Sequence, residues 1–481
     1  MEFTSLIFLF LFFPLLVIVY LFAQVRFRPI ILLAASLFFL AYGRLPVLWA
    51  YALLVGGNFI LGHWVEQKPG KRRLNLGVCY NLAILLFYKI FTTFSPLPFT
   101  YSFERVLPDF IEGNLLNLVY PIGLSYVALQ MISYLADVAR GLIPGERKFI
   151  NFALYVTFFP KILTGPITPF RSVHNELAAP QSTIQNVADG LRRFAIGLTK
   201  KILIADQLAK IANPAFDLPT PNFQPYIAWL ALIAFTLQIY YDFSGFTDMA
   251  VGLGRIFGFT LPENFNEPFV SKSIGEFWRR WHMSLSAWFR EYVFYPLERH
   301  RLPAIGQQVN IILVFFLTGL WHGLTANYIV WGLIHGLALV LESTSFGRWL
   351  KRIRHPFQTV YLISIVSFAW IFFRSPSLSY ASAFIKRLGG DESGITPLPF
   401  SVTRPLPLID PTTWLAMGLG ILFLFPFKSC IIALLGNKLK LIPDLGIFPR
   451  LFTDILILVL FWAGIAVLVS GGFAPGIYDK F

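Results

Sequence analysis

Two histidines and an asparagine stand in one very apolar stretch of the chain, FLTGLWHGLTANYIVWGLIHG. They are His322, Asn327 and His335. Ionisable side chains in strongly apolar segments are expensive, and in membrane interiors they are functional candidates. An imidazole suits proton transfer, because its ordinary pKa of about 6.5 lies near neutral pH. His322 is therefore the first candidate catalytic residue.

The length of this stretch predicts a break beside His322. Apolar character runs from Val309 to Val340, which is 32 residues, or about 48 Å as one helix. That is too long for one crossing of a roughly 30 Å core and too short for two. The sequence WHGLTAN favours the break, so His322 would lie at a joint between two short helices, buried in protein. A histidine hydrogen-bonded only for packing is the alternative, and it is the favoured interpretation for His335.

A second candidate site lies in SIGEFWRRWHMSLSAWFREYVFYPL, residues 273–297. On a 3.6-residue helix the aromatic and basic side chains fall on different faces, which is typical of a helix at a membrane interface. His282 would sit at the edge of the apolar face and could point inward. Arginine binds phosphate well through its planar fork. A surface anchor without chemistry is the alternative to a site for a phosphate-bearing cytosolic substrate, for which the candidate residues are Arg279, Arg280, Trp281 and Arg290.

Three more polar side chains interrupt apolar runs. Asp242 and Asp248 lie in QIYYDFSGFTDMAVGLG, where they could pair with the arginines above or orient a substrate or a histidine. Lys161 lies in FFPKILTGPITPFR, whose proline steps predict a broken or re-entrant segment that lines a cavity. Lys161 is the side chain expected to face that cavity. Asn327 completes the set of candidate substrate-binding residues.

The composition predicts the membrane class. The chain has 481 residues, 56% hydrophobic and 13% charged, with a mean hydropathy of +0.65. A soluble domain is usually about 45–50% apolar and about 25% charged. Because lipid offers no hydrogen-bond partners to the backbone, the chain should be an all-α polytopic membrane protein.

About 11–13 apolar segments can be distinguished, some too short to cross alone and therefore re-entrant or buried. The first lacks a basic flank and is expected to be a retained span rather than a signal peptide. The longest polar loop is expected at 376–410. The segments lie near 4–23, 29–43, 46–65, 74–94, 118–137, 149–165, 193–212, 226–247, 309–321, 325–342, 357–373, 411–435 and 452–471.

Loop charges predict the orientation. The basic sequences RFR, KPGKRR and RGLIPGERK follow the first, third and fifth segments, whereas Glu104, Asp109 and Glu112 follow the fourth. The positive-inside rule then puts the N-terminus outside and the basic loops in the cytoplasm. This pattern accounts for the net charge of +14 without nucleic-acid binding.

Other chemistries lack their sequence signals. The two cysteines, Cys79 and Cys430, lie far apart and suggest neither a disulfide nor a metal site. There is no Walker loop, dinucleotide fingerprint, HExxH or GxSxG. No extramembrane stretch is long enough for a soluble hydrolase-like domain.

Four motifs together resemble one family. EFWRRWHMSLSAWFREY, YYDFSGFTDMAVGLG, FFPKILTGPITPFR and GLWHG are similar to sequences of membrane-bound O-acyltransferases, in the bacterial polysaccharide branch. That branch includes the membrane proteins of alginate, cellulose and peptidoglycan O-acetylation and the D-alanyl transferase of teichoic acids. The resemblance covers about residues 1–374, and the helices at 411–481 match less clearly.

The resemblance implies a single membrane domain, residues 1–481, with a ring of helices around a tunnel. It implies His322 as the catalytic residue and His282 as a second, cytoplasmic-side histidine. The expected reaction takes acetyl from a cytosolic thioester, acetyl-CoA, and passes it across a bacterial inner membrane for polysaccharide O-acetylation, with no bound cofactor or metal. A separate extracytoplasmic hydrolase-like acetyltransferase is the expected partner. D-alanyl transfer from a carrier protein, a non-catalytic scaffold and a flippase with proton-relay histidines remain alternatives.

Overall fold

The computed structural model describes residues 1–43, 45–94, 120–301, 306–395, 410–425 and 448–471. In these residues the regular secondary structure is helical, with one isolated antiparallel bridge between Phe265 and Trp281. The predicted all-α class is confirmed. The described chain divides into two compact units, the first with Met1–Phe194 and Thr247–Glu263 and the second with Ala195–Phe246 and Asn264–Ile477.

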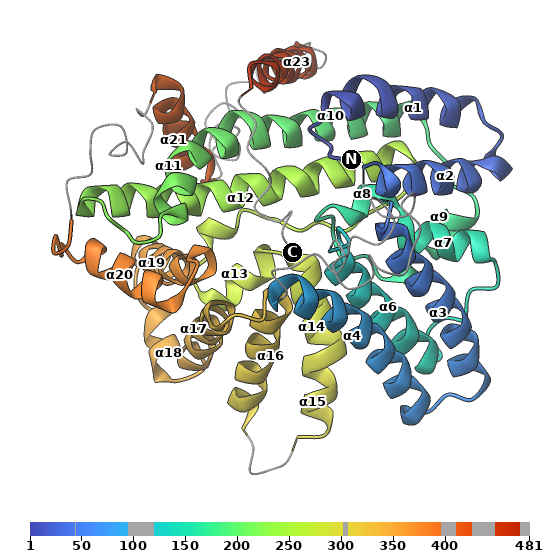
Figure 1. Cartoon of the computed structure of the whole chain (residues 1–481), viewed down its shortest axis with the longest axis horizontal. Coiled ribbons are helices and arrows are strands. Elements are labelled where there is room, and N and C mark those ends of the chain that lie inside the picture. Colours follow the sequence, from blue (N-terminus) through green and yellow to red (C-terminus); the bar gives the residue numbers. More distant parts are fainter. Residues whose placement is uncertain (44, 95–119, 302–305, 396–409, 426–447, 472–481) are drawn as a thin grey trace, which may run out of the picture. The chain divides into compact units, whose positions relative to one another are not determined.

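The first unit contains the N-terminal helices (Figure 1). Helix α10 begins in the first unit and ends in the second. The C-terminal part of α12, from Thr247 on, also belongs to the first unit. The helices are η1 (Phe8–Phe12), α1 (Phe13–Phe22), η2 (Val25–Phe27), α2 (Arg28–Ala41), α3 (Val47–Gln67), α4 (Lys71–Phe94), α6 (Leu124–Ala139), α7 (Phe149–Thr157), α8 (Phe159–Ile162), α9 (Phe170–Ala178) and α10 (Ile184–Thr199).

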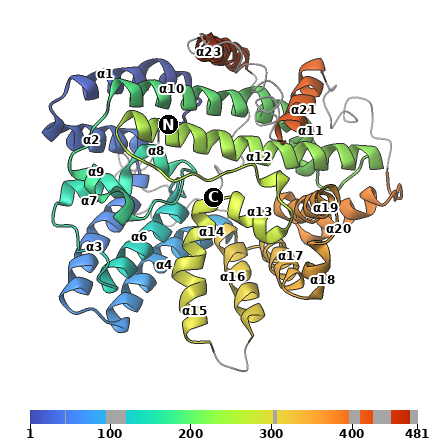
Figure 2. The same cartoon turned by 180° about the vertical axis from the view of Figure 1, so that it is seen from behind.

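Helices α3, α4 and α6 pack together in the first unit (Figure 2). Asn58 on α3 and Asn81 on α4 are fully buried, and each amide donates to the other's Oδ1 at 2.9 and 2.8 Å. Small and amide side chains commonly connect helices in a membrane, where apolar contact alone does not drive association. This amide pair therefore sets the register of α3 against α4.

The second unit contains the remaining helices, including those that carry the candidate histidines. They are η3 (Lys200–Ala205), α11 (Asp206–Asp217), α12 (Pro225–Ile256), η4 (Pro268–Val270), α13 (Ile274–Arg280), α14 (Met283–Phe289), η5 (Arg290–Phe294), α15 (Tyr295–Arg299), α16 (Gln307–His322), α17 (Ala326–Glu342), α18 (Ser345–Leu350), α19 (His355–Arg374), α20 (Leu378–Leu388), α21 (Pro411–Phe423) and α23 (Phe448–Val469).

Among the described residues, five helices are long and apolar enough to cross a membrane, and several apolar helices are shorter. The shorter ones agree with the expectation that some segments do not cross alone. The five are Val47–Gln67, Lys71–Phe91, Pro225–Ile256, His355–Arg374 and Leu451–Val469. The ring around a tunnel and the single domain stay predictions.

Two of the differences from the sequence prediction have a clear physical reason. Helix α12 ends at Ile256 rather than near 247, and Asp248, which lies in the added part, is neutralised by Arg193 at 2.7 Å. The predicted loop at 376–410 is wrong in its first part, where α20 forms. Ser377 caps α20 by accepting from Tyr380 N at 3.1 Å, and Tyr380 and Phe384 bury one face. The acidic loop after the fourth segment lies outside the described residues.

Candidate active site

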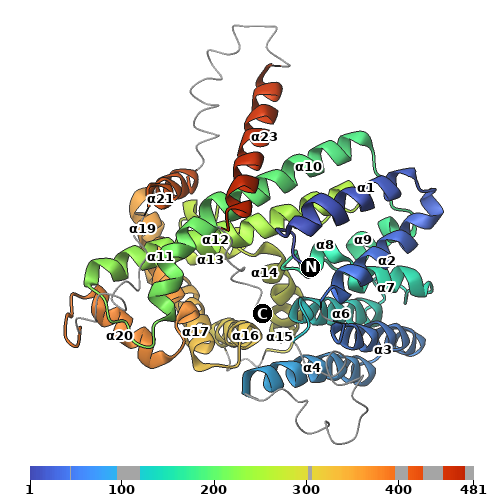
Figure 3. The same ribbon diagram turned by 45° about the horizontal axis from the view of Figure 1, so that its top comes forward.

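The predicted break beside His322 is confirmed. Helix α16 ends at His322, α17 begins at Ala326, and His322 is only 4% exposed. The two helices lie side by side (Figure 3) because glycines let their backbones approach. A Cβ on Gly319 would lie 2.4 Å from Tyr328 O, and one on Gly332 would lie 2.3 Å from Phe315 O. The close approach presses the end of α16 against the first turns of α17.

Aromatic rings surround the His322 imidazole. Its centroid lies 4.9 Å from the ring of Trp331 and 5.2 Å from that of Phe373, both nearly perpendicular to it. Tyr328 lies 6.4 Å away and Trp321 4.8 Å away. Such an apolar enclosure shields the imidazole from water, which strengthens electrostatic interactions at that place.

His282 lies at a turn, not within the helix that the sequence predicts. The continuous amphipathic helix is wrong, because α13 ends at Arg280 and α14 begins at Met283. His282 has a left-handed backbone, with φ 45° and ψ 52°. Such a conformation costs a non-glycine residue about 1–3 kcal/mol and persists only where the surroundings enforce it.

Asn264 enforces this turn from outside the segment. Its carbonyl accepts Met283 N at 3.0 Å, and its Oδ1 accepts Ser284 N at 3.1 Å and Ser284 Oγ at 2.6 Å. The bridge between Phe265 and Trp281 adds a second attachment. The turn is therefore held by the residues that follow α12.

The turn brings His282 toward His322. His282 is 1% exposed, and its ring lies 4.7 Å from Phe243 and 6.3 Å from Trp321. Trp321 in turn contacts the ring of His322, so one indole links the two candidate histidines. Burial lowers the pKa of His282 to about 3, which makes its imidazole neutral at physiological pH.

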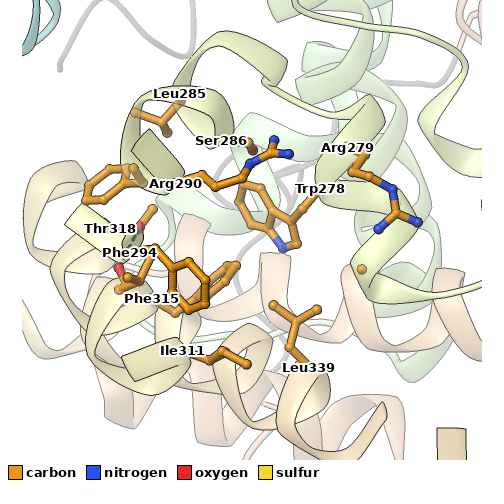
Figure 4. Close-up of a pocket in the computed structure, with 13 residues that line it drawn as sticks. Trp278, Arg279, Leu285, Ser286, Arg290, Phe294, Ile311, Phe315, Thr318 and Leu339 are labelled. Atoms are coloured by element: carbon orange, nitrogen blue, oxygen red, sulfur yellow. Dashed lines mark hydrogen bonds between the residues drawn. The ribbon is translucent and has the colours of Figure 1, made fainter. Parts of the chain in front are cut away.

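Two of the predicted donor-binding arginines line one cavity, the donor cavity (Figure 4). The cavity measures ≈ 370 Å³, and Arg279 and Arg290 provide its charge. Its wall is mostly apolar and includes Trp278, Phe315 and Thr318. Thr318 stands one helical turn before His322 on α16. The donor cavity thus offers basic groups and an apolar wall on α13 and α14, which flank the turn of His282, and on α16, which ends at His322; neither histidine lines the cavity.

Arg280 and Trp281 do not line the donor cavity. Arg280 pairs with Glu276 at 3.0 Å and donates to Asn266 O at 3.2 Å. Trp281 is 1% exposed and stacks on Phe277 at 5.4 Å. Both side chains brace α13, and a direct role in donor binding stays a prediction for each.

Asn327 and His335 are both held inside the second unit. Asn327 Nδ2 donates to Ser375 O at 2.6 Å, which ties the start of α17 to the end of α19. His335 is fully buried, and its Nδ1 accepts from Trp278 Nε1 at 3.4 Å. Its ring also lies 5.2 Å from Trp331. These contacts agree with a packing role for His335.

Asp242 pairs with a lysine rather than with the arginines of residues 273–297. Its carboxylate lies 2.8 Å from Lys201 Nζ, which also contacts Asp206 at 2.6 Å. All three are buried. The adjacent Phe243 contacts the His282 ring, so this ion cluster fixes the part of α12 that packs against His282.

Lys161 and Asp248 belong to the first unit. The predicted interruption at the proline steps is confirmed, because α8 ends at Ile162 and α9 begins only at Phe170; a further break at Phe158 separates α7 from α8. Lys161 is 2% exposed, donates to Gln130 Oε1, and lies 3.6 Å over the ring of Tyr155. Asp248 pairs with Arg193, which also binds Glu263. A donor-binding role for Lys161 or Asp248 stays a prediction.

Sequence reasoning missed the residues that surround the histidines. Tyr328 and Trp331 share a face of α17 directly after the predicted break, a spacing that could have placed them beside His322. Phe373 lies on α19, and Asn264 precedes the 273–297 segment. Nothing in the local pattern connects these last two residues to either histidine.

The fold and this site define a class, an integral membrane protein whose described residues are helical and whose second unit holds two buried histidines in contact with one indole and a basic, apolar-walled cavity. Residues 73–382 match the family model described as MBOAT, membrane-bound O-acyltransferase family. The chain belongs to the membrane-bound O-acyltransferase family and is a membrane O-acyltransferase.

Three curated relatives illustrate the range of similar proteins. A probable alginate O-acetylase of Azotobacter vinelandii is 36% identical over 397 residues, 79% of this chain and 76% of the relative. A peptidoglycan O-acetyltransferase of Helicobacter pylori is 33% identical over 402 residues, 75% and 73% of the two chains. A teichoic acid D-alanyltransferase of Bacillus subtilis is 32% identical over 253 residues, 49% and 62% of the two chains.

Proposed function

We propose that this chain takes an acetyl group from cytosolic acetyl-CoA and passes it across the bacterial inner membrane for O-acetylation of an extracytoplasmic polysaccharide. The observation that carries this proposal is His322, buried at the helix joint among aromatic rings and connected through Trp321 to His282. The names of the alginate and peptidoglycan O-acetylases among the relatives support acetyl as the group and polysaccharide as the acceptor.

The donor cavity supports a thioester with a phosphate-bearing carrier. Arg279 and Arg290 would bind the phosphates of CoA, because guanidinium groups form charge-assisted hydrogen bonds to phosphate oxygens. The apolar wall around Trp278 and Phe315 would take the acyl-bearing arm. This arrangement would put charge at one part of the donor and exclude water from the other.

His322 would act on the acetyl group in one of two ways. As a general base it takes the proton of an acceptor hydroxyl, whose oxygen forms the new bond to the carbonyl carbon. As a nucleophile its ring nitrogen forms that bond first and later passes the acetyl to the hydroxyl. In both cases the carbon–sulfur bond breaks, and the CoA thiolate receives a proton as it leaves.

The remaining components of the proposal concern location and partners. The basic loops would face the cytoplasm and the N-terminus would lie outside, in agreement with the positive-inside rule. A separate extracytoplasmic hydrolase-like acetyltransferase would complete the attachment to polymer. The second candidate function is D-alanyl transfer from a carrier protein. The match to the teichoic acid D-alanyltransferase, which covers 49% of this chain, supports it.

The test uses purified full-length protein in detergent with acetyl-labelled acetyl-CoA. Wild-type protein should release CoA, and His322→Ala should lose about 10²–10⁴-fold in rate, the usual contribution of a general acid–base group. Label retained on wild-type protein would select the nucleophilic route. If no CoA is released, the assay is repeated with the partner and then with a carrier-protein D-alanyl thioester. Turnover only with that thioester would establish the second candidate.

A further inference from the structure

A polar cavity of ≈ 570 Å³ lies beside the donor cavity in the second unit. Its basic lining residues are Lys272, Arg279, Lys351 and His355, and we call it the basic cavity. Arg279 also lines the donor cavity. Lys272, Lys351 and His355 lie outside the donor cavity, so the basic cavity adds two lysines that the proposed donor binding does not use.

The walls of the basic cavity are fixed by direct contacts. Glu342, at the end of α17, accepts Ile274 N at 2.5 Å and Gly275 N at 3.0 Å from α13. A Cβ on Gly347 would lie 1.8 Å from Glu342 O, so the α17–α18 turn needs glycine there. Gln358 Nε2 donates to Leu350 O at 2.8 Å and ties α19 to α18. The cavity is therefore preformed.

The positive charge of the basic cavity is available to bind an anion. Its two acids are engaged, Glu276 with Arg280 at 3.0 Å and Glu342 with the backbone of α13. Within the described ranges, no salt bridge engages Lys272, Arg279 or Lys351. Three exposed cations around one preformed space are suited to a phosphate group.

The basic cavity also lies where a membrane surface is expected. Helix α19, one of those able to span a membrane, begins at His355. Trp349 beside it is 55% exposed, and tryptophan side chains are enriched at headgroup depth. The same segment carries three further exposed cations, Arg348, Arg352 and Arg354. Basic segments next to a span attract the anionic lipids of the cytoplasmic leaflet.

We propose that the basic cavity binds a phosphate group, with the headgroup of an anionic phospholipid as its source. The phosphates of a soluble donor share this chemistry and are the other source. Lipid binding through Lys272 and Lys351, which lie outside the donor cavity, does not require acyl transfer and stands whether or not acetyl-CoA is the donor.

The test counts lipid bound to the purified full-length protein by native mass spectrometry, with phosphatidylglycerol or phosphatidylethanolamine as the probe. Wild-type protein should prefer phosphatidylglycerol, and Lys272→Gln/Lys351→Gln should weaken that binding about tenfold. The matched control is Arg348→Gln/Arg352→Gln, which removes the same charge from residues that do not line the cavity, and it should weaken binding less than about threefold. Equal thermal midpoints without lipid show that both variants are folded.

A second arm uses 3′-phosphoadenosine 5′-diphosphate as a soluble probe. If it binds wild-type protein but not Lys272→Gln/Lys351→Gln, and phosphatidylglycerol shows no preference, the phosphate site stands with a soluble source. Equal losses of phosphatidylglycerol binding in both double variants would overturn the proposal, because they indicate diffuse attraction. Failure of both probes to bind wild-type protein would also overturn it. Neither arm requires turnover.

Discussion

The two candidate histidines both stand at breaks between helices, but the breaks have different causes. The joint at His322 carries its own signal, a glycine-containing sequence between apolar helices, and glycines press α16 against α17. The turn at His282 has no glycine or proline, and Asn264 imposes it from outside the segment. A break encoded locally can be predicted from sequence, whereas one imposed by tertiary hydrogen bonds cannot.

The largest effect is expected where the close approach of α16 and α17 is blocked. Gly332→Ala should lower the free energy of unfolding by about 3 kcal/mol, because the new Cβ meets the backbone of Phe315. The matched control is Gly418→Ala in α21, where nothing lies within 4 Å. It should be neutral or slightly stabilising, since alanine favours a helix. Thermal unfolding in detergent compares the two, and equal midpoints would contradict the close approach.

Loss of the Asn264 side chain should destabilise the protein somewhat less than Gly332→Ala does. Asn264→Ala leaves the buried Ser284 N–H and hydroxyl without their acceptor, which should cost about 2 kcal/mol of unfolding free energy. Activity should also fall, because His282 shifts. Asn264→Asp keeps the acceptor oxygen and should retain more of both. If Asn264→Ala unfolds like wild-type protein, the turn is held by something else.

Substitutions of the arginines in residues 273–297 should change the KM for acetyl-CoA only where the arginine lines the donor cavity. Arg290→Gln should raise the KM for acetyl-CoA about tenfold, because it removes a charged partner of the donor phosphates. Arg280→Gln is the matched control, since Arg280 is occupied by Glu276 and lies outside the donor cavity. Initial rates over a range of donor concentrations measure both. An equal rise for Arg280→Gln would place the donor elsewhere.

The smallest effect distinguishes a left-handed turn from a continuous helix. His282→Gly and His282→Ala both remove the imidazole, but only glycine adopts the left-handed backbone without strain. The glycine variant should be the more stable by about 1 kcal/mol. In a continuous helix the order would be reversed by a similar amount. The thermal midpoints of the two purified variants decide between the turn and the helix.

The parts of the fold that the sequence predicts are those with a local signal, as at the break beside His322. Apolar runs gave the all-α membrane class, and the glycine and proline steps gave the breaks at His322 and in FFPKILTGP. The helix α20 was missed because its apolar residues stand inside the proline-rich segment 376–410, which as a whole favours a loop. Tyr380 and Phe384, one helical turn apart, form the buried face of α20. Its cap at Ser377 was a local signal that could have indicated the helix.

The candidate site is predicted only in part, for the same physical reason. Residue types suggested His322, His282 and the arginines, but not which arginines share a cavity. The partners of Asp242 and Asp248 are Lys201 and Arg193, because burial demands a nearby opposite charge. Such pairings depend on contacts between distant segments, which a local sequence pattern does not predict.

The most direct test of the central claim compares two buried histidines of the same helix pair. His322→Asn and His335→Asn both replace an imidazole next to Trp331 with a smaller polar group. CoA release from acetyl-CoA should fall at least about 100-fold in His322→Asn and stay within about threefold of wild type in His335→Asn, where only packing is disturbed. Equal activities in the two folded variants would contradict the assignment of His322 as the reaction centre.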